Sequence, residues 1–122
     1  MCVFVQVESV AGLRNLPAIA AVKGVDGVFF GPADLAASMG MLGRPADPEV
    51  RAAILEGITT VRGAGKAAGT LTSDRKLAHG YLAQGAQFVA VGVDATLLVK
   101  AAQDLAAEFT QISRAASSDC AY

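Results

Sequence analysis

Residues 24–38 read GVDGVFFGPADLAAS, and this segment indicates the fold more clearly than any other part of the sequence. Within it, Gly27 to Phe30 is a short, continuous apolar run, which is typical of a buried strand and is too short to form a helix. Gly31 and Pro32 then make a tight turn, and the chain passes straight into the start of a helix. This stretch therefore predicts a buried strand that turns directly into a helix.

The same pattern recurs on both sides of this stretch. Three further apolar runs predict strands at Cys2–Val7, Ala67–Leu71 and Phe88–Val91. Apolar residues at helical spacing separate the strands, and a long amphipathic helix is expected from Ala95 to Ile112. Because strands that alternate with helices form a parallel sheet covered by its crossovers, the fold class is α/β.

Four strand and helix units are half of the eight that close a (β/α)8, or TIM, barrel. The chain also begins inside an apolar strand, which suggests that an N-terminal part is missing. We therefore expect residues 1–112 to form the C-terminal half of such a barrel, and residues 113–122 to form a flexible tail.

The segments that connect helices and strands contain residues typical of helix ends and loops. Glycines that follow a helical pattern and precede a strand are expected to end helices in the left-handed conformation; they are Gly24, Gly65 and Gly85. The one long irregular connection, Met39 to Asp47, is expected to be a mobile loop. Asp47 followed by Pro48 predicts that the next helix begins there, with an N-cap and a first-turn proline.

Composition argues against two classes of partner. The 122 residues carry a net charge of −1 without a cluster of Lys or Arg, so a nucleic-acid partner is not expected. The apolar runs are too short to span a membrane, and we expect a cytoplasmic protein. Cys2 and Cys120 match no metal-ligand spacing and are expected to be reduced and structural, while His79, the only histidine, makes a poor metal site alone.

Polar residues at the ends of the strands are the candidates for chemistry, because ligands of parallel α/β folds bind beyond the carboxyl ends of the strands. Gln6 and Glu8 share one side of the first strand, opposite Val5 and Val7. We expect both to project into the barrel interior, where a buried carboxylate must be paired or must bind a cation. The alternative is that Glu8 only caps the helix that begins at Ser9.

The second strand ends in the turn Gly31-Pro32, followed by Ala33 and Asp34. Backbone N–H groups at a helix N-terminus bind anions, and only Pro32 in this turn lacks such a donor, so a substrate carboxylate is expected on Ala33 and Asp34. The alternative is that Asp34 only interacts with the helix dipole, a contribution of about 0.3 to 1 kcal/mol. Together, Glu8 and Asp34 end successive strands and suggest a site for Mg²⁺ or Mn²⁺ completed by water and substrate oxygens.

The motifs VQVE at residues 5–8, GVDGVFFGPADLAAS at residues 24–38 and FVAVGVD at residues 88–94 resemble the HpcH/HpaI family of class II pyruvate aldolases. The resemblance extends to about Phe109 and covers the second half of the family's barrel. It implies reversible aldol cleavage of a 4-hydroxy-2-oxo acid to pyruvate and an aldehyde, through a metal-bound pyruvate enolate. The implied cofactor is Mg²⁺ or Mn²⁺, with other divalent transition metals as alternatives.

The resemblance also implies roles for individual residues. Glu8 and Asp34 match the metal ligands, and Gln6 matches a polar residue beside the metal. The turn residues Gly31 and Pro32 precede Ala33 and Asp34, whose N–H groups match those that receive the pyruvate carboxylate. Leu71 and Val93 match the apolar rim that faces the aldehyde. The family's catalytic arginine and histidine come from earlier strands outside this chain, and Arg44, Arg75 and His79 lie in a loop or helix and do not replace them.

Three other hypotheses compete with the metal-dependent aldolase. Lys66, the only lysine near a strand, lies at the strand's beginning and is badly placed for a Schiff-base aldolase. No glycine-rich nucleotide motif follows a strand. The serious alternative is a non-catalytic half-barrel or interaction module. Its inward side chains, such as Val3, Val5 and Phe30 or their alternates, would need cover from the missing N-terminal half or another copy of the chain, so we expect a homo-oligomer.

Overall fold

The four apolar runs form one parallel sheet in the order β1-β2-β3-β4. In this computed structural model, which describes the backbone of residues 1–118 and the side chains of residues 1–110, the chain divides into two compact units, residues 1–91 and residues from 92 onward. The strands of the first unit are β1 (Phe4–Val7), β2 (Gly27–Phe30), β3 (Ala67–Leu71) and β4 (Phe88–Ala90). The four predicted strands and the α/β class are thus confirmed, although β1 begins at Phe4 rather than Cys2 and β4 ends at Ala90 rather than Val91.

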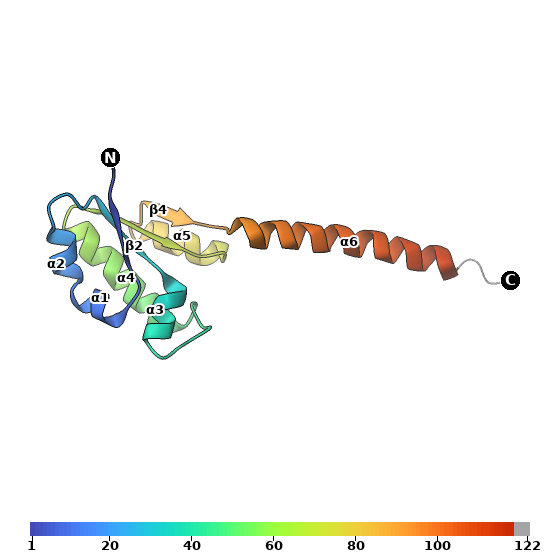
Figure 1. The fold of residues 1–122 in the computed structure, drawn as a ribbon, viewed down its shortest axis with the longest axis horizontal. Helices are drawn as coiled ribbons and strands as arrows, with labels where there is room; N and C mark the ends of the chain where they lie inside the picture. Colours follow the sequence, from blue (N-terminus) through green and yellow to red (C-terminus); the bar gives the residue numbers. More distant parts are fainter. Residues whose placement is uncertain (119–122) are drawn as a thin grey trace. The chain divides into compact units, whose positions relative to one another are not determined.

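Helices alternate with these strands, as the sequence predicts. The helices of the first unit are α1 (Val10–Arg14), α2 (Leu16–Ala21), α3 (Pro32–Ser38), α4 (Pro48–Gly63) and α5 (Arg75–Ala83). The first helical pattern is divided into two short helices at Asn15, because Asn15 caps α1 and Pro17 lies in the first turn of α2. Figure 1 shows α4, in green, close to β2; it packs against β2 and β3 and also contacts α2 and α3.

The core lies on one face of the sheet. Val28, Phe30 and Ala68 are fully buried there, together with Ile54 and Ile58 from α4. The Thr70 side chain is buried on the same face, and its hydroxyl donates a hydrogen bond of 3.1 Å to the Phe30 carbonyl. The core therefore contains no unpaired polar group at Thr70. We call this side the covered face.

The other face of the sheet carries the alternate residues and is open in residues 1–91. Phe4 is 43% exposed and Phe88 is 54% exposed, and the Phe88 ring lies 6.4 Å from the Phe4 ring and 5.9 Å from the Phe29 ring, centroid to centroid. Gly27 makes room for Phe4, because a Cβ at Gly27 would lie 2.5 Å from a carbon of the Phe4 ring. We call this side the open face. Two residues named above among the inward candidates, Val5 and Phe30, lie on the covered face instead, because Val5 pairs with the buried Val28 and Phe30 is itself buried in the core.

The connections follow the predicted chemistry. The three glycines expected to end helices have positive φ angles, of 94° at Gly24, 74° at Gly65 and 100° at Gly85. Asp47 caps α4, and its carboxylate accepts a hydrogen bond of 3.1 Å from the Glu49 N–H. Between α3 and α4, Gly40 and Gly43 also adopt positive φ angles, and the mobility of this loop remains a prediction.

In its described residues, 92–118, the second unit contains one helix, α6 (Asp94–Ser118). It begins one residue before the predicted Ala95 and continues beyond the predicted end at Ile112, so part of the expected tail, residues 113–118, has helical backbone. Residues 119–122 lie outside the described part of the chain, and with them Cys120. Within the described residues, no helix is both long enough and apolar enough to span a membrane.

Candidate functional site at the carboxyl ends of the strands

Glu8 follows the last residue of β1 and turns away from the core. Val7 is buried on the covered face, whereas Gln6 is exposed and Glu8 half-buried on the opposite side, which is the alternation that the sequence predicts. The Gln6 side-chain amide donates a hydrogen bond of 2.7 Å to Oε2 of Glu8. This bond fixes the direction of the Glu8 carboxylate and leaves its other oxygen without a partner in the described residues.

Glu8 does not cap α1. Ser9 is the N-cap, and its hydroxyl accepts a hydrogen bond of 3.1 Å from the Gly12 N–H. The N–H of Val10 donates a hydrogen bond of 3.0 Å to the Ser38 hydroxyl, which ties the start of α1 to the end of α3. The capping alternative for Glu8 is therefore wrong, and its carboxylate is available for another role.

The register of the sheet brings Glu8 next to the turn after β2. Val7 pairs with Phe30, and the Gly31 N–H donates a hydrogen bond of 3.2 Å to the Val7 carbonyl. A Cβ at Gly31 would lie 2.9 Å from Oε2 of Glu8 and 3.1 Å from Nε2 of Gln6. The absence of a side chain at Gly31 therefore makes the space that the Gln6–Glu8 pair occupies.

The turn continues into α3 as the sequence predicts. Gly31 is the N-cap, Pro32 opens the helix, and Asp34 lies exposed in its first turn. The first α3 hydrogen bond is donated by the Leu35 N–H to the Gly31 carbonyl. The N–H groups of Ala33 and Asp34 donate no hydrogen bond to any described residue, as expected for the first turn of a helix without a side-chain cap.

The described residues offer two carboxylates here rather than a complete metal cage. No group of three or more His, Cys, Asp or Glu side chains comes together in the described part of the chain. Glu8 retains a carboxylate oxygen without a partner, and the Asp34 side chain makes no hydrogen bond or ion pair with a described residue. This donor set fits a hard divalent cation that keeps several waters, because Mg²⁺ commonly takes only one or two protein carboxylates.

A cavity of about 200 Å³ opens beside the same strand ends. It brings together Pro32, Ala33 and Leu71, which the sequence singles out separately. Its other lining residues come from the loop before α4, the segment after β3, and α5; they are Pro45, Ala46, Thr72, Ser73, Asp74, Leu77 and Tyr81. Sequence reasoning missed Thr72 and Ser73, although their position directly after a strand was a usable signal.

The other residues considered in the sequence analysis do not line this cavity. Val93 belongs to the second unit, and its role remains a prediction. Arg44 lies in the loop, paired with Asp47 at 3.2 Å, while Arg75 and His79 lie in α5, as expected. Lys66 precedes β3, and its ammonium donates a hydrogen bond of 2.7 Å to the Val25 carbonyl, which holds it at the amino end of the strands. Cys2 is a free, exposed thiol.

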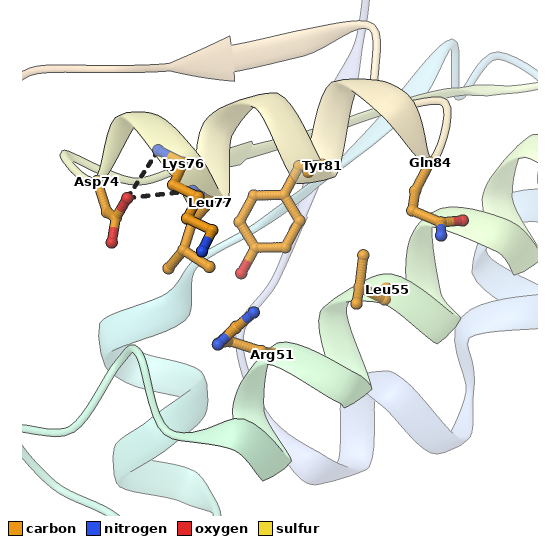
Figure 2. Close-up of a pocket in the computed structure, with 8 residues that line it drawn as sticks. Arg51, Leu55, Asp74, Lys76, Leu77, Tyr81 and Gln84 are labelled. Carbon is orange, nitrogen blue, oxygen red and sulfur yellow. Dashed lines mark hydrogen bonds between the residues drawn. The ribbon is translucent and has the colours of Figure 1, made fainter.

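A second cavity, of about 400 Å³, lies between α4 and α5 on the helical side of the first unit. Figure 2 shows the hydroxyl of Tyr81 directed toward Arg51, with Leu55 and Leu77 beside the ring. Burial raises the pKa of the Tyr81 phenol above its ordinary value, and the Arg51 guanidinium opposes this by favouring the phenolate. Asp74 caps α5 at the edge of this cavity and accepts hydrogen bonds from the N–H groups of Lys76 and Leu77.

Comparison with known proteins shows which family has this sequence and fold. Residues 1–101 match the profile of the HpcH/HpaI aldolase/citrate lyase family. The chain belongs to this family. A HpcH/HpaI aldolase/citrate lyase family protein from Burkholderia cenocepacia J2315, known as a crystal structure, superimposes with a TM-score of 0.83 at 37% identity, over 90% of this chain and 43% of that one.

Curated members of the HpcH/HpaI family are more similar in sequence. A hydroxypyruvate/pyruvate aldolase from Pseudomonas aeruginosa is 59% identical over 109 residues, which are 89% of this chain and 41% of that protein. A 4-hydroxy-2-oxo-heptane-1,7-dioate aldolase from Shigella sonnei is 58% identical over 109 residues, 89% of this chain and 42% of that protein. The chain thus spans less than half the length of these relatives, and its fold is part of the family's TIM barrel.

Proposed function

We propose that this chain supplies the metal and pyruvate-carboxylate site of a class II pyruvate aldolase. The observation that carries the proposal is the Gln6–Glu8 pair, seated against Gly31 beside the first turn of α3. The family match supports it, because it covers residues 1–101 and so includes Gln6, Glu8 and Gly31, and aldolase relatives match 89% of the chain. The remainder of the barrel, with the family's arginine and histidine, completes the site.

The proposed reaction is the reversible cleavage of a 4-hydroxy-2-oxo acid. The 4-hydroxyl loses its proton as its oxygen becomes the aldehyde carbonyl, and the bond between C3 and C4 breaks. The electron pair of that bond passes into the enolate of pyruvate, which is then protonated at C3. The barrier to this reaction is lowered by whatever stabilises the negative charge that develops on the 2-oxo group.

In this proposal Glu8 and Asp34 hold Mg²⁺ or Mn²⁺, with other divalent transition metals as alternatives. Such a cation, when bound, stabilises the developing charge on the 2-oxo group. Gln6 orients Glu8 through their 2.7 Å hydrogen bond, which is the role of an outer-shell partner. The free N–H groups of Ala33 and Asp34, presented by Gly31 and Pro32, receive the pyruvate carboxylate.

The other parts of the proposal concern the aldehyde and the assembly. Leu71, on the 200 Å³ cavity, and Val93 give apolar contact to the aldehyde. The open face, with Phe4 and Phe88 exposed, is covered by the remainder of the barrel, and the complete protein forms a homo-oligomer in the cytoplasm.

Metal binding tests the proposal in a reconstituted barrel, by which we mean this chain combined with the part of the Pseudomonas aeruginosa relative that it does not match. Titration with manganese in a calorimeter should show that Glu8→Ala and Asp34→Ala each lose most of the affinity. Aldolase activity should fall by about a hundred- to thousandfold, the cost of removing one electrostatic stabiliser. Glu56→Ala removes an exposed carboxylate from α4 and is the matched control. Parental manganese affinity in both site variants would show the assignment to be wrong.

A further inference from the structure

The cavity between α4 and α5, of about 400 Å³, is lined by two positively charged side chains that make no bond within the chain. Arg51 comes from α4, and Lys76 comes from the first turn of α5. Both residues are exposed, and neither side chain makes a hydrogen bond or an ion pair with a described residue. Two cations from different helices therefore border one space, and both are available to a ligand.

The Tyr81 hydroxyl is a third polar group in this cavity without a partner. Tyr81 is only 4% exposed, and a buried tyrosine hydroxyl usually has a hydrogen-bond partner. This hydroxyl has none among the described residues, where no fully buried side-chain oxygen is left unpaired, so its oxygen reaches the cavity. Figure 2 shows it directed toward Arg51. A bound ligand supplies the missing partner.

The charges of the lining indicate the charge of that ligand. Asp74 is the one carboxylate among the described lining residues, and one of its oxygens accepts two hydrogen bonds from the first turn of α5, at 2.7 and 3.1 Å. Two cations and one carboxylate leave a net positive charge, which a ligand with a single negative charge neutralises. A carboxylate suits Arg51, because a guanidinium group donates two parallel hydrogen bonds to its two oxygens.

The rest of the lining suits an apolar body. Leu55 and Leu77 lie beside the Tyr81 ring (Figure 2). Gly80 leaves part of the cavity unfilled, because a Cβ there would meet nothing within 4 Å, and packing therefore does not require a glycine in this helix. Since a water molecule takes up about 30 Å³ of liquid, 400 Å³ accommodates an acid of roughly ten non-hydrogen atoms.

We infer that this cavity binds a small monocarboxylate with an apolar or aromatic body. The carboxylate accepts hydrogen bonds from Arg51, Lys76 and the Tyr81 hydroxyl, near the positive N-terminal end of α5. The body of the ligand lies along Leu55 and Leu77. All of these residues belong to the first unit, and the inference does not depend on the proposed metal and pyruvate site.

Calorimetric titration of the reconstituted barrel with 3-phenylpropionate, an acid of this size and charge, tests the inference. The parent should bind it, and should bind the neutral amide of the same shape at least about tenfold more weakly, because charge-assisted hydrogen bonds are lost. Arg51→Gln and Lys76→Gln should each weaken binding of the acid about tenfold for the same reason. Arg75→Gln is the matched control, because Arg75 begins α5 but does not line the cavity.

A second variant tests the location without removing a charge. Gly80→Leu should fill the cavity and weaken binding at least as much as Arg51→Gln, and the open space at Gly80 allows the chain to fold. Gly63→Leu, at the end of α4, is its control, and circular dichroism checks that each variant is folded. Parental affinity in both Arg51→Gln and Gly80→Leu would overturn the inference. Equal affinity for the acid and its amide, or no binding of the acid to the parent, would also overturn it.

Discussion

The covered and open faces of the sheet are built from alternate residues of the same four strands, yet their surroundings differ. On the covered face, Phe30 is 0% exposed and packs among residues of α3 and α4. On the open face, Phe88 is 54% exposed, and its ring lies beside the rings of Phe4 and Phe29 on the same face. Hydrophobicity alone does not separate these phenylalanines, whereas their alternation along the strands does.

The difference has a direct functional meaning. The open face is the one that carries Gln6 and Glu8 at the carboxyl end of β1. In a (β/α)8 barrel the side chains of this face pack in layers inside the barrel, and the active site lies above them. The covered face therefore gives this chain its core, and we propose that the open face becomes a core and a site only when the barrel is closed.

Truncating one phenylalanine on each face should give the largest difference in the free energy of unfolding. Phe30→Ala should cost the chain about 3 to 5 kcal/mol, because it leaves a cavity in a packed core. Phe88→Ala should cost below about 1 kcal/mol in the chain alone, because an exposed side chain loses little burial. In the reconstituted barrel the cost of Phe88→Ala should rise toward that of Phe30→Ala. Urea unfolding followed by circular dichroism gives all four values, and equal costs in the chain alone would contradict the comparison.

Much of this architecture could be predicted from the sequence, because it depends on local patterns. Short apolar runs placed the four strands, and the period of two placed Gln6 and Glu8 opposite Val7. The division of the first helix at Asn15 was missed, since apolar spacing continues across it. Which phenylalanines fill the open face was not predicted either, because that depends on which side of the sheet the helices cover.

In the candidate site, too, the sequence predicted local features but not contacts between residues distant in sequence. The motifs identified Glu8 and the turn at Gly31, but the Gln6–Glu8 hydrogen bond depends on side-chain geometry. Likewise, the contact of Gly31 with that pair requires the pairing of Val7 with Phe30, a contact distant in sequence. Thr72 and Ser73 were missed because the cavity that they line is assembled from four separate segments.

A smaller change, in metal affinity, is expected from a substitution at Gly31, beside the Gln6–Glu8 pair. Gly31→Ala should lower the manganese affinity of the reconstituted barrel about tenfold, or about 1.4 kcal/mol, because its Cβ would displace the Gln6–Glu8 pair. Gly63→Ala at the end of α4 is the matched control, because an added Cβ there meets nothing within 4 Å and should leave the metal affinity unchanged. Unchanged metal affinity in Gly31→Ala would mean that the pair is not the metal site.

The smallest effect concerns Tyr81, on the covered side between α4 and α5. Burial raises its pKa in the folded chain above the ordinary value of 10.0, so the neutral phenol favours folding. That contribution is complete below pH 10.0 and is lost as the pH rises through the folded pKa, because the unfolded chain ionises first. Free energies of unfolding measured from pH 8 upward should fall more steeply in the parent than in Tyr81→Phe. Parallel curves would show that Tyr81 does not contribute to the loss.

We expect the open face and the strand ends of this chain to form an active site only within a closed barrel. Analytical sedimentation and pyruvate aldolase assays test this on the purified chain, before and after it is combined with the remaining part of the Pseudomonas aeruginosa relative. The chain alone should associate through its open face and have at least about a hundredfold lower activity, and reconstitution should restore the activity. A well-folded monomer with full aldolase activity on its own would contradict it.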